Sequence, residues 1–237
     1  RNDKNLRLAL SPLLADDSPL VQRRACEAFV RSGTTAPVDG LLNLLKSSDR
    51  WVRFAARIAL ERVPAEQWQE QALASHNPHV VTNAVLALRR SAPDALSPDE
   101  AVGVVAHLLR NGRGGLTETA FLDALRILEL ALIDGAQGPR TEQLGQQFLD
   151  LFPTGDTPTD NESARLLAVL QVPGAADKIV QPLQADETPG EQIHYALVLR
   201  YLGAGWNLAL KRQLLDWYEQ TRGWEGGHSM VPYLANI

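Results

Sequence analysis

The stretch Asp49–Leu60, DRWVRFAARIAL, decides the fold of this 237-residue chain. It opens with an acid, a residue type that suits the cap of a helix. Its apolar or small residues then follow the i, i+3, i+4, i+7, i+8 spacing of one buried helix face: Val52, Ala55, Ala56, Ala59 and Leu60. The stretch therefore predicts an amphipathic helix.

Two further stretches copy this framework, one 31 residues earlier and one 28 residues later. Three sets of residues correspond between the copies: Val21, Val52 and Val80; Ala25, Ala56 and Ala84; Phe29, Leu60 and Leu88. Each copy follows a polar cap and precedes a shorter helix, so one period holds a helical hairpin. The recurring alanine lets successive helices stack closely, and one hairpin cannot bury its apolar face alone. We therefore expect an all-α fold of stacked hairpins.

The pattern acid, x, x, Val, Arg, x, x, Ala occurs at Asp49, Val52, Arg53 and Ala56. With this pattern the chain resembles the HEAT family, particularly its short bacterial repeats. The earlier copy has glutamine and the later copy has valine in place of the arginine. The resemblance implies a right-handed α-α superhelix, a HEAT-like solenoid of about six to seven hairpins. It also implies a protein that mostly provides a binding surface.

Prolines, glycines and capping residues divide the chain into about thirteen expected helices. They cover residues 5–14 (broken near Pro12), 19–31, 37–45, 50–63, 64–74, 78–90, 97–109, 117–133, 139–152, 161–170, 175–183, 190–202 and 206–221. We expect one HEAT-like repeat domain over 1–237, with regular repeats over about 1–92 and less regular ones over about 97–222. A linker-like tail follows at 223–237. The loops at 134–139 and 153–160 are interpreted as changes of curvature rather than domain boundaries.

Composition and charge argue against several classes of function. The net charge of −5 disfavours broad nucleic-acid binding, which needs a basic face. The single cysteine, Cys26, excludes an intramolecular disulfide and a CxxCH haem attachment. No apolar run approaches the roughly 18 residues that suggest a membrane span. Because the chain opens with Arg1 rather than Met, we expect a processed product or an excised piece of a longer protein.

Residues that could carry chemistry are few and scattered. His76 and His79 could reach one metal ion, but they lack a third ligand and flank a helix cap. The glycine-rich segment 112–115 lacks the ending of a phosphate-binding loop, so it predicts a hairpin connection. We expect Cys26 to be an inert packed thiol.

Acidic residues cluster in only one place, where Asp156, Asp160 and Glu162 adjoin a loop. An exposed cap with weak affinity for a cation is the most that this cluster suggests. We therefore expect no catalytic residue, no cofactor and no metal site.

The residues expected to contact a partner are Trp51, Arg53, Arg57, Arg23, Arg24 and Arg89. If the arginines line the concave face of the repeats, they form a positive stripe for an acidic partner or a nucleic-acid backbone. The interpretation that we favour for these arginines is an Asp–Arg ladder between repeats together with solvated helix faces. Trp51 falls at a helix start, where it could edge a groove and act as a binding hot spot.

The tail from Trp217 to Ile237, WYEQTRGWEGGHSMVPYLANI, carries a second resemblance. It is similar to the junction in large secreted bacterial proteins of the membrane-bound dehydrogenase-like or haem-binding family. In that family a β-propeller precedes HEAT repeats and a c-type cytochrome domain follows them. The resemblance implies that this chain is the middle module and that its location is periplasmic or extracytoplasmic. His228 could then be a haem ligand, although a turn residue at a domain junction is the interpretation that we favour.

Three functions stay open at this point. The first, which we favour, is a non-catalytic, monomeric scaffold that binds a protein partner or flanking domains of the same polypeptide. The second is a nucleic-acid-binding or DNA-repair protein that uses the arginine stripe. The third is part of an enzyme whose active site lies at an interface with absent domains.

Overall fold

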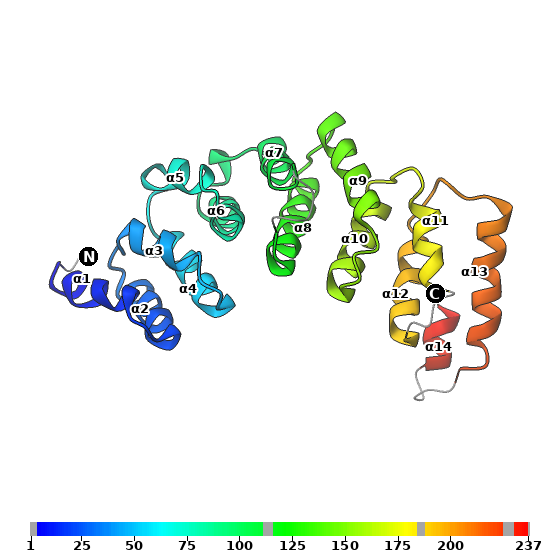
Figure 1. Ribbon diagram of the computed structural model, residues 1–237, viewed down its shortest axis with the longest axis horizontal. Helices are drawn as coiled ribbons and strands as arrows, with labels where there is room; N and C mark the ends of the chain where they lie inside the picture. Colours follow the sequence, from blue (N-terminus) through cyan, green and yellow to red (C-terminus); the bar gives the residue numbers. More distant parts are fainter. Residues whose placement is uncertain (1–3, 111–115, 184–187, 225–229, 237) are drawn as a thin grey trace. The chain divides into compact units, whose positions relative to one another are not determined.

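A computed structural model of the protein describes residues 4–110, 116–183, 188–224 and 230–236. All regular elements in these ranges are α-helices or short 3-10 turns, which confirms the all-α fold expected from the sequence. The helices group into two compact units, Arg1–Ala136 and Gln137–Ile237 (Figure 1). The single repeat domain expected over 1–237 stays a prediction.

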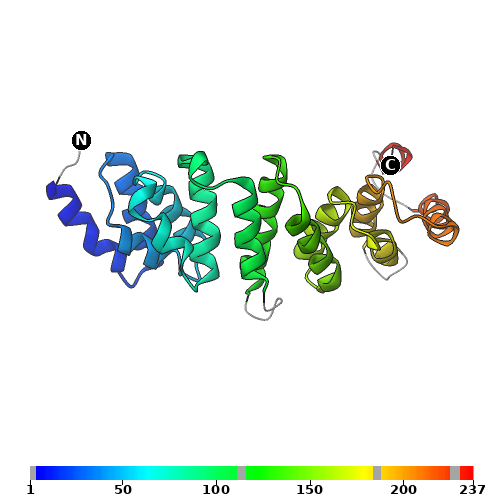
Figure 2. The ribbon, with the colours of Figure 1, turned by 90° about the horizontal axis from the view of Figure 1, so that it is seen from above.

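Unit 1 is a stack of helical hairpins. Its helices are α1 (Lys4–Leu10), α2 (Pro19–Ser32), α3 (Val38–Leu44), α4 (Arg50–Leu60), α5 (Gln69–Leu73), α6 (Pro78–Ser91), α7 (Pro98–Leu108) and α8 (Glu118–Ile133). In Figure 1, α3, α5 and α7 lie on one side of the stack, and α2, α4, α6 and α8 form a row on the other. Within that row each helix packs against the next. Figure 2 shows these helices lying across the direction in which the hairpins succeed one another.

Unit 2 continues with paired helices. They are α9 (Pro139–Leu151), α10 (Thr157–Val169), α11 (Ala175–Val180), α12 (Pro189–Leu199), α13 (Leu208–Thr221) and α14 (Met230–Ala235). Helix α10 packs against α9, α11 and α12, and α11 also contacts α13. The helix α14 falls in the tail that we expected to be linker-like.

The sequence repeat corresponds to the buried seam of the unit 1 row. Ala25, Ala56 and Ala84 are almost completely buried, as are Phe29, Leu60 and Leu88, the larger residues one turn further on. Small side chains at the first set let α2, α4 and α6 approach closely, and the larger ones fill the space between hairpins. The predicted stacking of three matched helices is therefore confirmed.

Helix boundaries in unit 1 follow the expected capping chemistry. The Asp49 carboxylate accepts hydrogen bonds from the backbone N–H groups of Trp51 at 2.7 Å and Val52 at 3.2 Å. Asn77 caps α6 in the same way. Gly33 ends α2 with a φ of 67°, a left-handed conformation that glycine adopts without strain. The first expected helix is interrupted, as predicted, by a 3-10 turn at Ser11–Ala15.

Several expected helices differ from those observed, and two of the differences have a clear local cause. The helix predicted over 64–74 is instead a 3-10 turn, Ala65–Gln67, followed by α5. The break lies at Trp68, whose buried indole N–H donates to the carbonyl of Val63 at 3.1 Å and fixes a non-helical backbone.

The helix predicted to begin at 161 begins at Thr157, inside the expected loop 153–160. Asp156 caps it by accepting from the N–H of Thr159 at 3.1 Å. Asp160 then lies within the helix, buried, and its carboxylate accepts from the N–H of Thr154 and of Gly155. The expectation of an exposed acidic cluster is therefore wrong for Asp160, because its carboxylate is used to hold the preceding turn.

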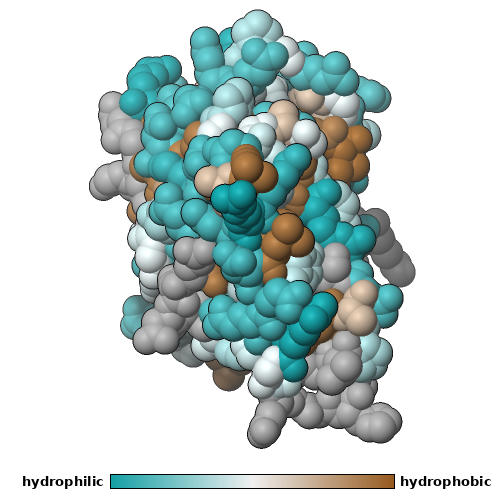
Figure 3. Space-filling model, turned by 90° about the vertical axis from the view of Figure 1, so that its right-hand side faces the viewer, coloured by the Kyte–Doolittle hydropathy of each residue, from teal (hydrophilic) through white to brown (hydrophobic). Residues whose placement is uncertain are grey.

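The surface is consistent with a fold that buries its apolar stripes between helices. On the face that Figure 3 shows, hydrophilic side chains predominate and hydrophobic ones form scattered patches. Within the described ranges, no helix is long and apolar enough to cross a membrane.

Candidate functional site

Helix α4 carries the most distinctive surface of unit 1. Its buried stripe faces the core and leaves Arg50, Trp51, Phe54 and Arg57 on the opposite side, at positions that share one helix face. Trp51 is 50% exposed and Phe54 is 51% exposed. Two large aromatic side chains at this exposure on adjacent turns leave a large apolar surface open to solvent.

A pocket of about 200 Å³ opens along this face, and we call it the α4 pocket. Three successive helices of the row line it: Arg50, Trp51, Arg53, Phe54 and Arg57 come from α4, Asn83 and Leu86 from α6, and Asp123 from α8. All of them belong to unit 1. The pocket therefore depends on the stacking of hairpins and not on one helix alone.

Arginine side chains hold the two aromatic rings. The guanidinium of Arg50 lies 4.5 Å from the centre of the Trp51 ring, and that of Arg23, from α2, lies 5.7 Å away. The Arg57 guanidinium lies 5.2 Å from the centre of the Phe54 ring. Each such cation–π contact contributes about 0.5–1 kcal/mol at an exposed site. These contacts reduce the freedom of the rings before any partner arrives.

Most of the arginines in the expected stripe have acidic partners. Arg57 pairs with Glu61 at 2.7 Å, and Arg90 reaches the same carboxylate at 3.1 Å. Burial lowers the pKa of Arg57, and the charge of Glu61 opposes that change. Arg23 and Arg24 both pair with Glu27, and the two hydrogen bonds lower the pKa of this carboxyl group. Two carboxylates thus offset half of the charge of these four arginines.

Arg53 has a structural environment that the sequence did not indicate. Its side chain is buried, and it donates to the carbonyl oxygens of Ser47 at 2.7 Å and Ser48 at 3.0 Å. It therefore joins α4 to the turn after α3, where free carbonyls need donors. The expected Asp–Arg ladder is wrong in this detail, because Asp49 caps the helix and Arg53 bonds to backbone.

Asp123 contributes the pocket's carboxylate. One of its oxygens lies 4.0 Å from Nδ1 of His79, while Nε2 of His79 lies 3.3 Å from the hydroxyl of Thr117. Burial raises the pKa of Asp123, and the charges of Arg53 and Arg57 oppose the rise. Burial, followed by the charge of Arg53, lowers the pKa of His79. The lowered pKa favours the neutral form of the His79 imidazole, which lies beside the carboxyl group of Asp123.

Arg50 differs from the other pocket arginines because, in the described ranges, its guanidinium has neither a carboxylate nor a backbone carbonyl as partner. In the described ranges no carboxylate lies within ion-pair distance of its guanidinium, which is stacked on Trp51. The side chain is exposed at the first residue of α4. It is therefore available to an anion that enters the pocket.

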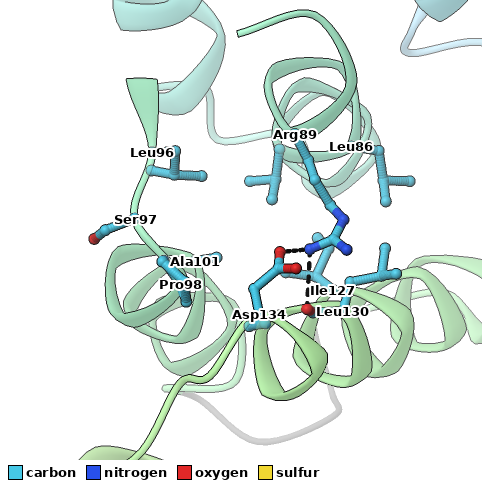
Figure 4. Close-up of a pocket in the computed structure, with 11 residues that line it drawn as sticks. Leu86, Arg89, Leu96, Ser97, Pro98, Ala101, Ile127, Leu130 and Asp134 are labelled. Carbon is cyan, nitrogen blue, oxygen red and sulfur yellow. Dashed lines mark hydrogen bonds and ion pairs between the residues drawn. The ribbon is translucent and has the colours of Figure 1, made fainter. Parts of the chain in front are cut away.

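Arg89 lies in a different pocket, between α6, α7 and α8 (Figure 4). It forms an ion pair with Asp134 and donates to the carbonyl of Leu130 at 2.9 Å. Both partners are at the C-terminal end of α8, where the helix dipole also favours a cation. The structure thus does not bring Arg89 together with Trp51, and its contacts join α6 to α8.

Other sequence candidates contribute no site among the described residues. No group of three or more potential metal ligands occurs in these ranges, which include His76 and His79. Cys26 is buried, and burial raises the pKa of its thiol to about 12, so it is unreactive at neutral pH. The glycines at 112–115 and His228 lie outside the described residues.

Unit 2 has a larger groove of about 400 Å³ between α10 and α12. Exposed Val169 and Tyr201 line it, together with Leu197 and His194. Its arginine, Arg165, pairs with Glu162 at 3.1 Å, and burial lowers the pKa of His194. This groove is therefore apolar and close to neutral, unlike the α4 pocket.

Some of the residues that line the α4 pocket were among those expected from the sequence to contact a partner. Of the six expected partner-contacting residues, Trp51, Arg53 and Arg57 line it, and Arg23 reaches it through the Trp51 ring. Arg24 is instead an exposed residue paired with Glu27. The prediction missed Arg50, Phe54 and Asp123. The first two could have been found, since they occupy the polar side of the stretch that defined the repeat.

One comparison with known proteins supports the repeat assignment. The family model described as HEAT repeats matches residues 7–67, which include α2, α3 and α4. The match supports the HEAT-repeat family for this part of the chain, and HEAT repeats generally act as scaffold or interaction modules. No curated protein matches the chain.

Proposed function

We propose that this chain is a non-catalytic HEAT-like interaction module that binds a protein partner, or flanking domains of its own polypeptide, through the α4 pocket. The observation that carries the proposal is the exposure of Trp51 and Phe54, side by side, in a pocket that three stacked helices form. Burial of exposed aromatic rings is a large source of binding energy.

The composition of the pocket matches that of protein-binding hot spots. Tryptophan and arginine are enriched in such spots, which lie in preformed pockets surrounded by polar residues. Trp51 is held by Arg50 and Arg23, so little side-chain entropy remains to be lost when a partner binds. The tail resembles a junction in dehydrogenase-like and cytochrome-containing proteins. For this reason we propose, more specifically, that the partner is a flanking domain of the same polypeptide.

The nucleic-acid alternative has weaker support. Binding to a phosphate backbone needs several uncompensated cations along a track. Here Glu27, Glu61 and Asp134 form ion pairs with five of the arginines on α2, α4 and α6, which breaks the track of free cations. The pocket also contains the carboxylate of Asp123, and the whole chain carries a net charge of −5.

The proposal is tested by selecting a displayed library of random peptides on the wild-type chain and measuring the affinity of the enriched peptides for two variants. Trp51→Ala removes the central ring of the pocket, and we expect it to weaken binding about 10-fold or more. Tyr201→Ala, which removes an exposed aromatic ring from unit 2, is the control and should leave the affinity unchanged. If no enriched peptide responds to Trp51→Ala, the α4 pocket is not the binding site.

A further inference from the structure

We propose that the α4 pocket recognises an acidic side chain within an extended peptide segment, with Arg50 as the anchor of the carboxylate and the rings of Trp51 and Phe54 as apolar walls for its neighbours. This inference rests on the proposed function and specifies the chemistry of the partner. It does not concern a nucleic acid or a metabolite.

The distribution of charge within the pocket points to one anion at one place. Arg57 is paired with Glu61, and Arg53 is buried against the carbonyls of Ser47 and Ser48. Arg50 is the pocket arginine that has neither type of partner in the described part of the chain. A planar guanidinium that is already stacked on a ring can bind a carboxylate through two parallel hydrogen bonds.

The size of the pocket favours a side chain over a whole small molecule. Its volume of about 200 Å³ lies below the roughly 300–1,000 Å³ of sites that enclose drug-sized ligands. Its open side carries the two exposed rings, which can cover the aliphatic parts of the residues on either side of the acid. Both features suit a chain that passes over the pocket and inserts one residue.

Asp123 makes the pocket selective among anions. Its carboxyl group comes from α8 and lines the pocket together with Arg50 and Arg57. A singly charged carboxylate can sit near Arg50 and away from Asp123, whereas a doubly charged phosphate is repelled more strongly. The arrangement therefore favours aspartate or glutamate over a phosphorylated residue.

The test measures fluorescence anisotropy with two labelled nine-residue peptides, both acetylated and amidated so that only side chains carry charge. One alternates Glu with Leu, and the other alternates Gln with Leu. We expect the wild-type chain to bind the Glu peptide about 10-fold more tightly, because one carboxylate–guanidinium contact is worth about this ratio. Equal affinity for the two peptides would overturn the inference.

The decisive variant is Arg50→Glu, matched by Arg140→Glu as its control. Both arginines are exposed and occupy the first turn of a helix, α4 and α9 respectively, where glutamate suits the helix dipole and both variants should fold. We expect Arg50→Glu to remove the preference for the Glu peptide and to create a preference for a Lys–Leu peptide. Arg140→Glu should retain the wild-type preference.

The outcomes separate this inference from the proposed function. If selected peptides depend on Trp51 but are neutral or basic, the function stands and the acidic partner is wrong. If single-stranded DNA competes with the Glu peptide and its binding falls steeply with salt, the pocket binds nucleic acid instead, and the inference is overturned. If no peptide depends on Trp51, the proposed function itself fails.

Discussion

Helices α4 and α6 follow the same sequence repeat, yet matched residues on their outer sides differ in exposure to solvent. Val52 of α4 corresponds to Val80 of α6, and both are buried. At the next matched position on the outer side, Phe54 is 51% exposed in α4, whereas Thr82 is completely buried in α6. The repeat therefore determines the inner seam but not the outer side of each helix.

The neighbouring helix explains the difference. Helix α8 packs on α6, and Arg89 fastens the end of α6 to the end of α8. Only Asp123 of α8 reaches the pocket beside α4. Helix α6 packs against α4, α5, α7 and α8, whereas α4 packs against α2, α3 and α6. The exposed side of α4 is where we propose that a partner binds, whereas the buried side of α6 contributes to stability.

Exchanging the two matched residues should produce the largest contrast. Thr82→Phe places a ring in a filled space, so we expect the free energy of unfolding to fall by about 1–3 kcal/mol. Phe54→Thr removes a half-exposed ring and its contact with Arg57, so the loss should be smaller, about 0.5–1 kcal/mol. Urea denaturation of both variants measures these changes. A similar loss in the two variants would show that α4 and α6 do not differ in this way.

The two arginines Arg53 and Arg50 have different expected roles in the α4 pocket: Arg53 stabilises the fold, and Arg50 is proposed to bind the partner. Arg53→Met retains most of the side-chain volume but removes the two hydrogen bonds to Ser47 and Ser48. We expect the free energy of unfolding to fall by about 1–2 kcal/mol, since backbone carbonyls lose a charged donor. Arg50→Met, at the exposed position, removes only the contact with the Trp51 ring and should lower it by about 0.5–1 kcal/mol. Urea denaturation measures both changes. A larger loss of unfolding free energy for Arg50→Met than for Arg53→Met would contradict these roles.

A smaller effect should appear on acidification. Because burial lowers the pKa of His79 below its ordinary 6.5, the unfolded chain takes up this proton more readily than the folded chain does. The free energy of unfolding should therefore decrease as the pH falls below about 6.5, by roughly 1 kcal/mol for each unit by which the folded pKa is lowered. Denaturation at pH 7.5 and 5.5 measures it. His79→Gln should reduce the dependence, and exposed His76→Gln should not. An unchanged slope in His79→Gln would refute this origin.

The sequence predicted the fold of unit 1 well because the fold depends on local patterns. The spacing from Val52 to Leu60 identified a buried face, and Asp49 and Asn77 marked the helix starts through their capping chemistry. The prediction was wrong near Asp156, where prolines and threonines suggested a loop although they form a cap and a first turn.

The site was less predictable because it depends on contacts between distant parts of the chain. Asp123 reaches the pocket from α8, about 70 residues after Arg50, through the stacking of two further hairpins. Asp134, the partner of Arg89, also comes from a distant part of the chain, so no residue spacing within one helix could predict the pair. Arg50 and Phe54 are part of the repeat stretch, but only the structure shows that both side chains are exposed.

The central claim is that the exposed side of α4 is where an acidic segment binds, and the five tryptophans of the chain allow a direct measurement. The indole N–H signals in a nitrogen-15 NMR spectrum can be followed while the Glu–Leu peptide is added, with the Trp51 signal assigned from Trp51→Phe. We predict that the Trp51 signal shifts in a saturable manner, whereas the signals of buried Trp68 and Trp217 stay in place. A peptide that binds without moving the Trp51 signal would contradict the account.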